Sequence, residues 1–407
     1  MSDHSPAAAD ERDDKLEPEQ PKERRPIITA LPVQDAGERR AAITPESVAT
    51  LTSAGWRCVL PEGLGHRAGF SDDAYLASGC EMVDRVHAAI ADADAVACVE
   101  PPSDEIVRSL RRGSLLIGLL APFARADLIE TAALAGVSSI AMELVPRSTI
   151  AQPMDALSSQ ASLAGYAAVL RAADRLPRVF PMMSTPAGTI PPARVLVVGT
   201  GVAGLQAIAT AVRLGARVSA YDVRAAAKEQ VESLGARFVS IESASGAETR
   251  DGYATAQSDE QLASQRQALA ETCAASDVII TTAQIFGKPA PTIIDRGMIA
   301  GMRTGSVIVD AAIATGGNVE GAAAGDDTVI GGVSLIADPH LASSVAAEAS
   351  RMYASNIASL LAHITPEGPT AELDPGTNDI LASVLVTHAD AVRTTAATAH
   401  AGGAATP

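Results

Sequence analysis

Aromatic side chains are scarce in this chain of 407 residues, at 3%, whereas 47% of its residues are hydrophobic. A core must therefore be packed from Ala, Val, Ile and Leu, as in parallel sheets covered by helices. Cysteine is also rare, and the four cysteines lack both paired metal-ligand spacing and a dense disulfide framework. We therefore expect packing roles, a reducing compartment and no metal for Cys58, Cys80, Cys98 and Cys273.

An excess of positive charge is missing as well, because the formal net charge is −17. Without a basic surface to displace counterions along a phosphate backbone, we expect no nucleic-acid partner. No stretch reaches the roughly 18 consecutive apolar residues that a membrane helix requires. Residues 1–25 alternate charge with proline and lack an apolar core, which indicates a disordered tail and not a secretory signal.

Alternating strand-like and helix-like segments fill the rest of the chain. They predict an N-terminal α/β domain at 26–157, and a helix from Ser158 to Asp174 leads into a second unit at 158–340. Another long helix, about Ser344 to His363, indicates that residues 341–390 return to complete the first domain, with 391–407 as a second disordered tail. The fold class is α/β: two Rossmann-like, doubly wound parallel-sheet domains joined by long helices. The polar span 246–267 is expected to be an exposed, mobile loop.

A glycine-rich turn opens the second unit. The run Gly199-Thr200-Gly201-Val202-Ala203-Gly204 follows the strand-like RVLVV and begins the helix-like GLQAIATAVRLG, the context that a dinucleotide fingerprint needs. The first glycine permits a tight turn, the second lets the backbone approach a pyrophosphate, and the third lets helix and strand pack closely. The amides of the helix N-terminus would then face the anion. A tight turn without a ligand is the alternative.

Asp222 ends the next strand-like segment, VSAYD, about twenty residues downstream. A carboxylate there can accept hydrogen bonds from both hydroxyls of the adenosine ribose, and it would repel a 2′-phosphate. The pattern therefore favours NAD(H) over NADP(H), although the neighbouring Arg224 leaves room for the opposite preference. Val223, Arg224 and Gln267 complete the set of residues expected to contact the cofactor.

The sequence resembles the alanine dehydrogenase and transhydrogenase family from GERRAAITPESV to about Leu361. The most specific segments are RSTIAQPMDALSSQASLAGY, FPMMSTPAGTIPPARVLVVGTGVAGLQAIATA, DVRAAAKEQVESLGA, TTAQIFGKPAP and GSVIVDAAIATGGNVEG. The resemblance implies a soluble NAD(H)-binding subunit of a proton-translocating nicotinamide nucleotide transhydrogenase. This subunit would be a homodimer and would pass hydride to NADP+ bound on a partner chain. Its partners would be the membrane and NADP-binding subunits. It would be cytoplasmic and peripheral at the inner face of the cell membrane.

The same resemblance implies roles for individual residues. Arg147 would hold the carboxamide end of the nicotinamide, Gln152 would bridge toward the partner's nucleotide, and Asp155 and Ser158 would position the ring. Asp155 could equally cap a helix that begins near Ala156, because Asp is favoured at that position. Two further pairs belong to loops at the cofactor. Gly252 and Tyr253 match a mobile loop that closes over the nucleotide, and Ala283 and Gln284 would lie against it.

Direct hydride transfer between two nicotinamides exchanges no proton with the substrate, so proximity and orientation can supply the catalysis. An amino-acid dehydrogenase, in contrast, needs a general base and a cation in its cleft. Alanine dehydrogenases carry a lysine and a histidine in two segments that face the substrate. Here those segments read ACVEPP and IGLLAPF, and both groups are missing. Arg39 and Arg40 match a carboxylate-binding position of those enzymes, or pair with nearby acids.

Two departures from the transhydrogenase pattern leave alternatives open. Pro153 replaces a small polar residue and removes a backbone donor, which predicts an altered loop. Ala314 stands where relatives have an acidic residue. A stand-alone NAD-dependent amino-acid dehydrogenase or imine reductase is therefore the second hypothesis, and an NAD(H)-binding partner without turnover is the third.

Overall fold

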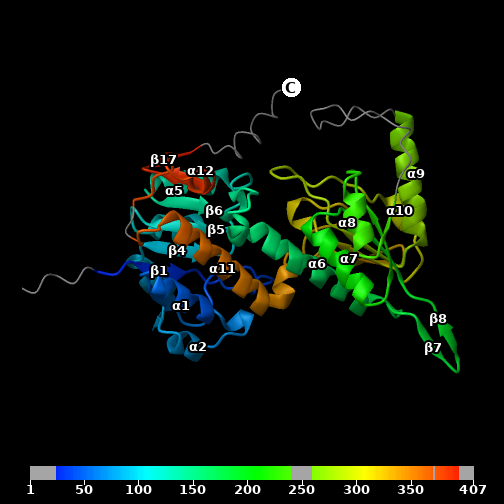
Figure 1. Ribbon diagram of the computed structural model, residues 1–407, viewed down its shortest axis with the longest axis horizontal. Coiled ribbons are helices and arrows are strands. Elements are labelled where there is room, and N and C mark those ends of the chain that lie inside the picture. Colours follow the sequence, from blue (N-terminus) through cyan, green and yellow to red (C-terminus); the bar gives the residue numbers. More distant parts are fainter. Residues whose placement is uncertain (1–23, 240–258, 370–371, 394–407) are drawn as a thin grey trace, which may run out of the picture.

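The computed structural model describes residues 24–239, 259–369 and 372–393. Most of both predicted tails lies outside these ranges, and so do Gly252 and Tyr253 of the predicted mobile loop. Two α/β lobes stand next to each other and are connected by the long helix α6 (Ala156–Arg175) (Figure 1). In the described part of the chain, every helix is too short or too polar to cross a membrane.

The first lobe contains an eight-stranded sheet in the order β17-β16-β6-β5-β4-β1-β2-β3. The six strands from β3 to β6 are parallel, whereas β16 is antiparallel to β6 and β17 to β16. The elements of this lobe are β1 (Ile27–Ala30), α1 (Pro45–Ser53), β2 (Arg57–Pro61), η1 (His66–Ala68), α2 (Asp72–Ala77), β3 (Glu81–Val83), α3 (Val86–Ala91), β4 (Ala95–Cys98), α4 (Asp104–Ser109), β5 (Leu115–Gly118), α5 (Ala126–Leu134), β6 (Ser138–Ala141), η2 (Met142–Leu144), η3 (Gln152–Met154), α11 (Ala346–Ile364), α12 (Asp379–Val384), β16 (Leu385–His388) and β17 (Ala391–Val392).

The second lobe contains a seven-stranded sheet in the order β11-β10-β9-β12-β13-β15-β14, parallel except for β14. A separate hairpin of β7 (Met183–Thr185) and β8 (Gly188–Ile190) projects from it (Figure 1). The remaining elements are β9 (Arg194–Val198), α7 (Val202–Arg213), β10 (Arg217–Tyr221), α8 (Ala227–Ser233), β11 (Arg237–Phe238), α9 (Asp259–Ala275), β12 (Val278–Thr281), α10 (Arg296–Ala300), β13 (Val307–Asp310), η4 (Ile313–Thr315), β14 (Asp327–Ile330), β15 (Val333–Ile336) and η5 (Leu341–Val345).

The parallel strands of both sheets follow the doubly wound order, in which the third, second and first strands lie on one side and the fourth, fifth and sixth on the other. This confirms the predicted α/β class. The strand order reverses between β1 and β4 in the first sheet and between β9 and β12 in the second. In such sheets, ligands bind outside the carboxyl ends of the strands at the reversal.

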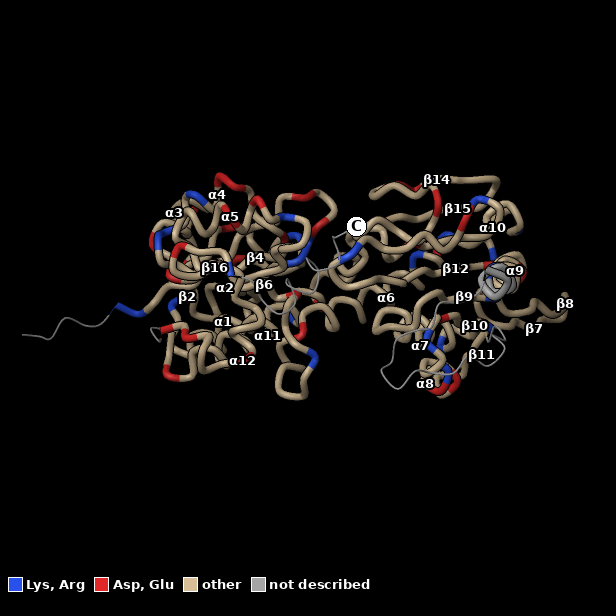
Figure 2. The backbone as a smooth tube through the Cα atoms, turned by 90° about the horizontal axis from the view of Figure 1, so that it is seen from above, with Lys and Arg blue, Asp and Glu red and all other residues tan. Residues whose placement is uncertain are grey.

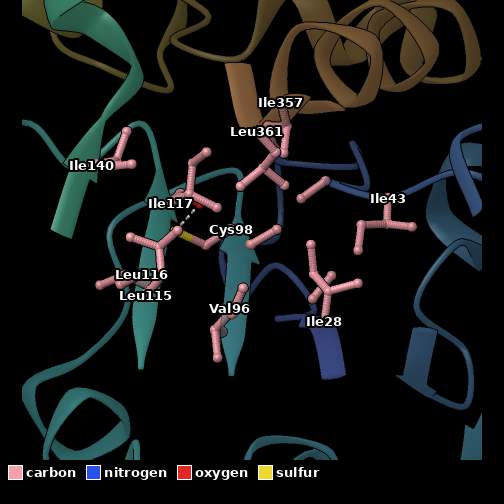
Figure 3. Packing of buried hydrophobic residues seen from close by; sticks show 14 of the residues in the cluster. Ile28, Ile43, Val96, Cys98, Leu115, Leu116, Ile117, Ile140, Ile357 and Leu361 are labelled. Carbon is pink, nitrogen blue, oxygen red and sulfur yellow. Dashed lines mark hydrogen bonds between the residues drawn. The ribbon is translucent and has the colours of Figure 1, made fainter. Parts of the chain in front are cut away.

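The strands at the centre of each sheet are mostly apolar because helices cover both faces. All four residues of β4, β5, β12 and β13 are buried. Helix α11 covers one face of the first sheet, and its Ile357 and Leu361 point toward the strands that carry Cys98 and Ile117 (Figure 3). This packing ties a C-terminal helix to N-terminal strands.

Helix α6 carries no charged side chain from 156 to 170, which agrees with its position between the two lobes. Charged residues of both signs lie on the outside of each lobe (Figure 2). Its Gly165 lies against the second lobe, because a Cβ added there would be 2.1 Å from the carbonyl oxygen of Ala203. The close approach of two helix backbones therefore requires glycine.

Two predicted boundaries are wrong. Residues 259–267 of the predicted loop belong to α9, because Glu, Gln, Leu, Ala and Arg are good helix formers even in a polar segment. The rest of that loop, 246–258, lies outside the described residues. The C-terminal tail does not begin at 391, because Ala391–Val392 form β17 and pair with β16.

Candidate functional site

The glycine turn lies at the strand-order reversal of the second sheet, between β9 and α7. Gly199 has φ +89°, and a Cβ there would be 2.9 Å from both the amide nitrogen of Ala283 and Oγ1 of Thr282. A Cβ on Gly204 would be 1.9 Å from the carbonyl oxygen of Gly199. Both positions therefore exclude a side chain, one through backbone conformation and both through close packing.

The remaining face of the turn is open. Apart from its two chain neighbours, no described residue has an atom within 4 Å of a Cβ added at Gly201, the residue that precedes α7. No side chain caps α7 at Gly201, and the first amides of a helix have no partner within the helix. The turn and the first residues Val202 and Ala203 therefore offer donors and positive helix-dipole potential to an anion.

Asp222 follows β10 directly, and its carboxylate closes one side of the turn. Oδ2 accepts hydrogen bonds from the amide (2.8 Å) and hydroxyl (2.6 Å) of Thr200 and from Arg224 (3.0 Å). Oδ1 accepts from the amide (2.9 Å) and Nε (3.0 Å) of Arg224. Burial favours a raised pKa for Asp222, but the bonds from Arg224 and Thr200 outweigh it and lower the pKa. The group is therefore a carboxylate at neutral pH.

A cavity of about 480 Å³ opens beside Asp222. Val223, which is 86% exposed, belongs to its wall, and an ion pair of Arg266 with Asp295 stands at one side. A volume of this order suits a ring system of a small ligand. The cavity is lined by Tyr221, Val223, Arg266, Leu269, Pro291, Thr292, Ile293, Asp295, Met298 and Glu320.

The loop after β12 faces the glycine turn and is held by a buried polar network. Thr282 donates its hydroxyl to the carbonyl oxygen of Gly199 (2.9 Å). Asn318 accepts from the amide of Ala283 (3.0 Å) and donates to its carbonyl oxygen (2.8 Å). Asp310 in turn accepts from the amide of Asn318 (2.8 Å). Ala283 is thereby fixed beside the turn, while Gln284 is exposed.

The segment before α6 holds the other predicted residues. Asp155 caps α6 by accepting from the amide (2.8 Å) and hydroxyl (2.6 Å) of Ser158. Arg147 and Gln152 are exposed in the preceding loop. Asp155 is ten residues before Gly165, or about 15 Å along the helix from its contact with Ala203.

Of the two departures, Pro153 has a local explanation and Ala314 has none in the structure. Pro153 lies in the first turn of η3, where its missing N–H costs no helical hydrogen bond, and its carbonyl oxygen accepts from Asn356 (2.7 Å). The predicted loss of a loop donor is therefore harmless within this turn. Ala314 is exposed in η4.

The two arginines of the GERRAAITP segment both have protein partners. Arg39 donates to the carbonyl oxygen of Ser343 at 2.7 Å and 3.0 Å. Arg40 pairs with Glu38 (2.6 Å) and donates to Gln160 of α6 (2.8 Å). Arg40 therefore matches the alternative of pairing with a nearby acid, whereas the partner of Arg39 is a backbone carbonyl.

The sequence did not single out Thr200 and Asn318, although both organise the site. Thr200 lies within the fingerprint at a position that tolerates many residues. The spacing of the motif therefore does not predict its bonds to Asp222. Asn318 follows two glycines after η4, and only the fold brings it to the β12 loop. Gln267, in contrast, is exposed and donates to Glu271 on α9 (3.0 Å), and it does not line the cavity.

Comparison with known proteins covers both lobes. Residues 34–164 match the family model of the alanine dehydrogenase/PNT N-terminal domain, and 168–395 match that of the alanine dehydrogenase/PNT C-terminal domain. The chain is 44% identical over 345 residues to the first part of NAD(P) transhydrogenase subunit alpha of Rickettsia prowazekii, covering 84% of this chain and 90% of that protein. It is 43% identical to the protein of the same name from Rhodospirillum rubrum, covering 84% and 88%. A crystal structure of transhydrogenase from Sinorhizobium meliloti superposes with a TM-score of 0.79 at 40% identity, covering 90% of this chain and 98% of that one.

Proposed function

The chain belongs to the alanine dehydrogenase/PNT family, and on this premise we propose that it is the NAD(H)-binding subunit of a nicotinamide nucleotide transhydrogenase. It binds NADH in the second lobe and passes hydride to NADP+ held by a partner subunit. The observation that carries the proposal is the open glycine turn at the mouth of α7 with Asp222 beside it. A pyrophosphate fits the turn, and an adenosine fits the carboxylate and the adjoining cavity.

The preference for NAD(H) follows from charge. The lowered pKa of Asp222 keeps a full negative charge beside the turn, and its side chain is only 6% exposed. A 2′-phosphate next to this carboxylate would meet like-charge repulsion in a partly desolvated site. The ribose diol of NADH meets an acceptor instead.

Bound NADH supplies the hydride, and the residues of this chain bind and orient. Gly201 leaves room for the pyrophosphate, Gly199 and Gly204 give the turn its shape and close packing, and Ala283 and Gln284 form the wall opposite the turn. Arg147 donates to the carboxamide of the nicotinamide, while the Asp155–Ser158 pair sets the ring angle. Gln152 reaches toward the nucleotide of the partner. Such positioning is sufficient for direct transfer because no proton moves with the hydride.

The partners in this proposal are an NADP-binding subunit and a membrane subunit that couples transfer to proton translocation. The Rickettsia and Rhodospirillum relatives are each named as the first part of an alpha subunit, which supports further chains in the assembly. This chain would then work in the cytoplasm at the inner face of the membrane.

A homodimer is supported by the β7–β8 hairpin. It projects from the second lobe and exposes Met182 (66%), Met183 (43%) and Ile190 (44%), an apolar strip that a second copy of the chain would cover (Figure 1). Light scattering on wild type should give twice the chain mass of 41.5 kDa, and a Met183→Ser/Ile190→Ser variant should give a monomer. An unchanged mass for the variant would contradict this interface.

Transfer itself can be measured by mixing the purified chain, NADH and an NADP+ analogue with the NADP-binding subunit of a related transhydrogenase. We expect turnover for wild type, and Arg147→Ala or Gln152→Ala should slow it about tenfold or more. NADH affinity should stay nearly unchanged in Gln152→Ala and should fall in Arg147→Ala, which loses its bond to the carboxamide. Arg85→Ala, whose side chain is 80% exposed on the first lobe, is the matched control. NADH binding without any transfer would contradict the catalytic proposal and favour an NAD(H)-binding partner without turnover.

The dehydrogenase alternative makes a different prediction. A carboxylated substrate needs a cation in the cleft, but Arg39 and Arg40 are engaged with Ser343, Glu38 and Gln160. NADH oxidation by the chain alone with a 2-oxo acid and ammonia, or with a cyclic imine, would support this alternative over the transhydrogenase.

A further inference from the structure

Arg224 occupies the carboxylate that the proposed site offers to ribose. Asp222 already accepts five donors on its two oxygens: two from Thr200, and three from the amide, Nε and a terminal nitrogen of Arg224. A carboxylate has about four lone-pair sites. Both hydroxyls of an adenosine ribose therefore cannot bond to Asp222 while all of these donors remain.

The two groups of donors differ in how easily they can leave. Thr200 is 2% exposed and belongs to the glycine turn, so its amide and hydroxyl are fixed relative to Asp222. The side chain of Arg224 is 62% exposed and bonds only to Asp222 among the described residues. Because the guanidinium already lies mainly in solvent, water can replace its bonds to Asp222 when it leaves, so Arg224 is the donor that ribose can displace.

We propose that the Arg224 side chain competes with the adenosine ribose for Asp222 and must release the carboxylate when NADH binds. This inference rests on the proposed NAD(H) site. Arg224 therefore lowers the affinity for NADH. Once released, its guanidinium stays tethered two residues from Asp222 and partly offsets the negative charge there. It therefore also narrows the preference for NADH over NADPH.

The test is calorimetric titration of the full chain with NADH and NADPH. Arg224→Ala keeps the backbone amide but removes the guanidinium, and its NADH affinity should rise about 2- to 5-fold, because water offsets most of the cost of releasing an exposed guanidinium. The ratio of the NADPH dissociation constant to the NADH dissociation constant should be larger in this variant than in wild type. Lys228→Ala is the matched control, because it removes an exposed cation that pairs with Glu232 and not with Asp222.

Two further measurements isolate the ribose. Reduced nicotinamide mononucleotide lacks the adenosine ribose, so Arg224→Ala should bind it no more tightly than wild type does. Raising the salt concentration weakens the ion pair of Arg224 with Asp222. The difference in NADH affinity between wild type and Arg224→Ala should therefore become smaller.

The outcomes separate the two proposals. If wild type takes up no NADH, the NAD(H) site itself fails. If wild type binds NADH but Arg224→Ala binds it equally well or more weakly, the proposed competition is overturned. Weaker binding would show that Arg224 contributes to the cofactor contact. An equal gain in NADH affinity with Lys228→Ala would show that the effect comes from the overall charge of the protein. That result would also overturn the proposed competition.

Discussion

Phe123 and Phe286 meet edge to face, with ring centroids 5.2 Å apart and an interplanar angle of 84°. Phe123 follows β5 in the first lobe, and Phe286 follows β12 in the second, next to Ala283 and Gln284. Both loops leave the carboxyl ends of parallel strands. The contact therefore joins the two lobes at the edges where doubly wound sheets bind ligands.

Truncating either ring should loosen the loop after β12. Phe123→Ala and Phe286→Ala each remove the same edge-to-face contact, so hydrogen exchange in a peptide covering 282–288 should become faster in both variants. The double variant should exchange no faster than the single ones, because the rings act as a pair. Additive effects would show that each ring acts through separate neighbours.

Alanine at two glycines of the turn should separate folding from binding. Gly204→Ala puts a methyl group 1.9 Å from a backbone oxygen, so it should lower the melting temperature, with a cost of about 1–3 kcal/mol. Gly201→Ala places its methyl group in open space, so the melting temperature should hold while NADH affinity falls about tenfold or more. Calorimetry and thermal denaturation followed by circular dichroism measure the two effects. Equal loss of stability in both variants would be inconsistent with the open face of the turn.

Removing the carboxylate should change cofactor preference. Asp222→Ala deletes the ribose acceptor and the charge that repels a 2′-phosphate, so NADH affinity should fall while NADPH affinity rises or holds. Because the pKa of Asp222 is lowered from an already acidic value, the carboxylate is fully ionised and wild-type affinity for NADH should be flat from about pH 5 to about pH 8. Titrations at both ends of that range check it, and retained NADH preference in the variant would exclude Asp222 as its source.

Acid should weaken the first lobe through Glu38. Burial favours a raised pKa, but the bonds from Arg40 and Ser343 lower the pKa of Glu38 to about 2, and His340 also faces it at 3.5 Å. Because the folded pKa is below the unfolded value near 4.5, the stabilisation is complete above about pH 4.5 and is lost as the pH falls toward 2. The full contribution is about 3 kcal/mol.

Trp56 is the single tryptophan, is buried in the first lobe and reports its unfolding. The urea midpoint of its fluorescence should fall between pH 5 and pH 3, and Glu38→Gln should start lower and show a smaller decline. The exposed Glu367→Gln is the control and should follow wild type. A Glu38→Gln curve parallel to wild type over this range would assign the acid sensitivity to other groups.

The sequence alone determined the parts of this protein that depend on neighbouring residues. Strand composition and the spacing of glycines predict the α/β class, the turn before α7 and the acid at the end of β10, because each follows from local backbone geometry. The capping of α6 by Asp155 belongs to the same group, since cap and helix are adjacent in the chain.

Tertiary structure decided the relationships between distant segments. Nothing in the sequence around Asn318 pairs it with Ala283, and nothing near Phe123 indicates Phe286, because such contacts arise only when two sheets and their loops have packed. The state of Asp222 is of the same kind: its position was readable, but its saturation by Thr200 and Arg224 depends on side-chain directions in the folded turn. Spacing along the chain specifies which groups are present, whereas packing specifies which donors reach which acceptors.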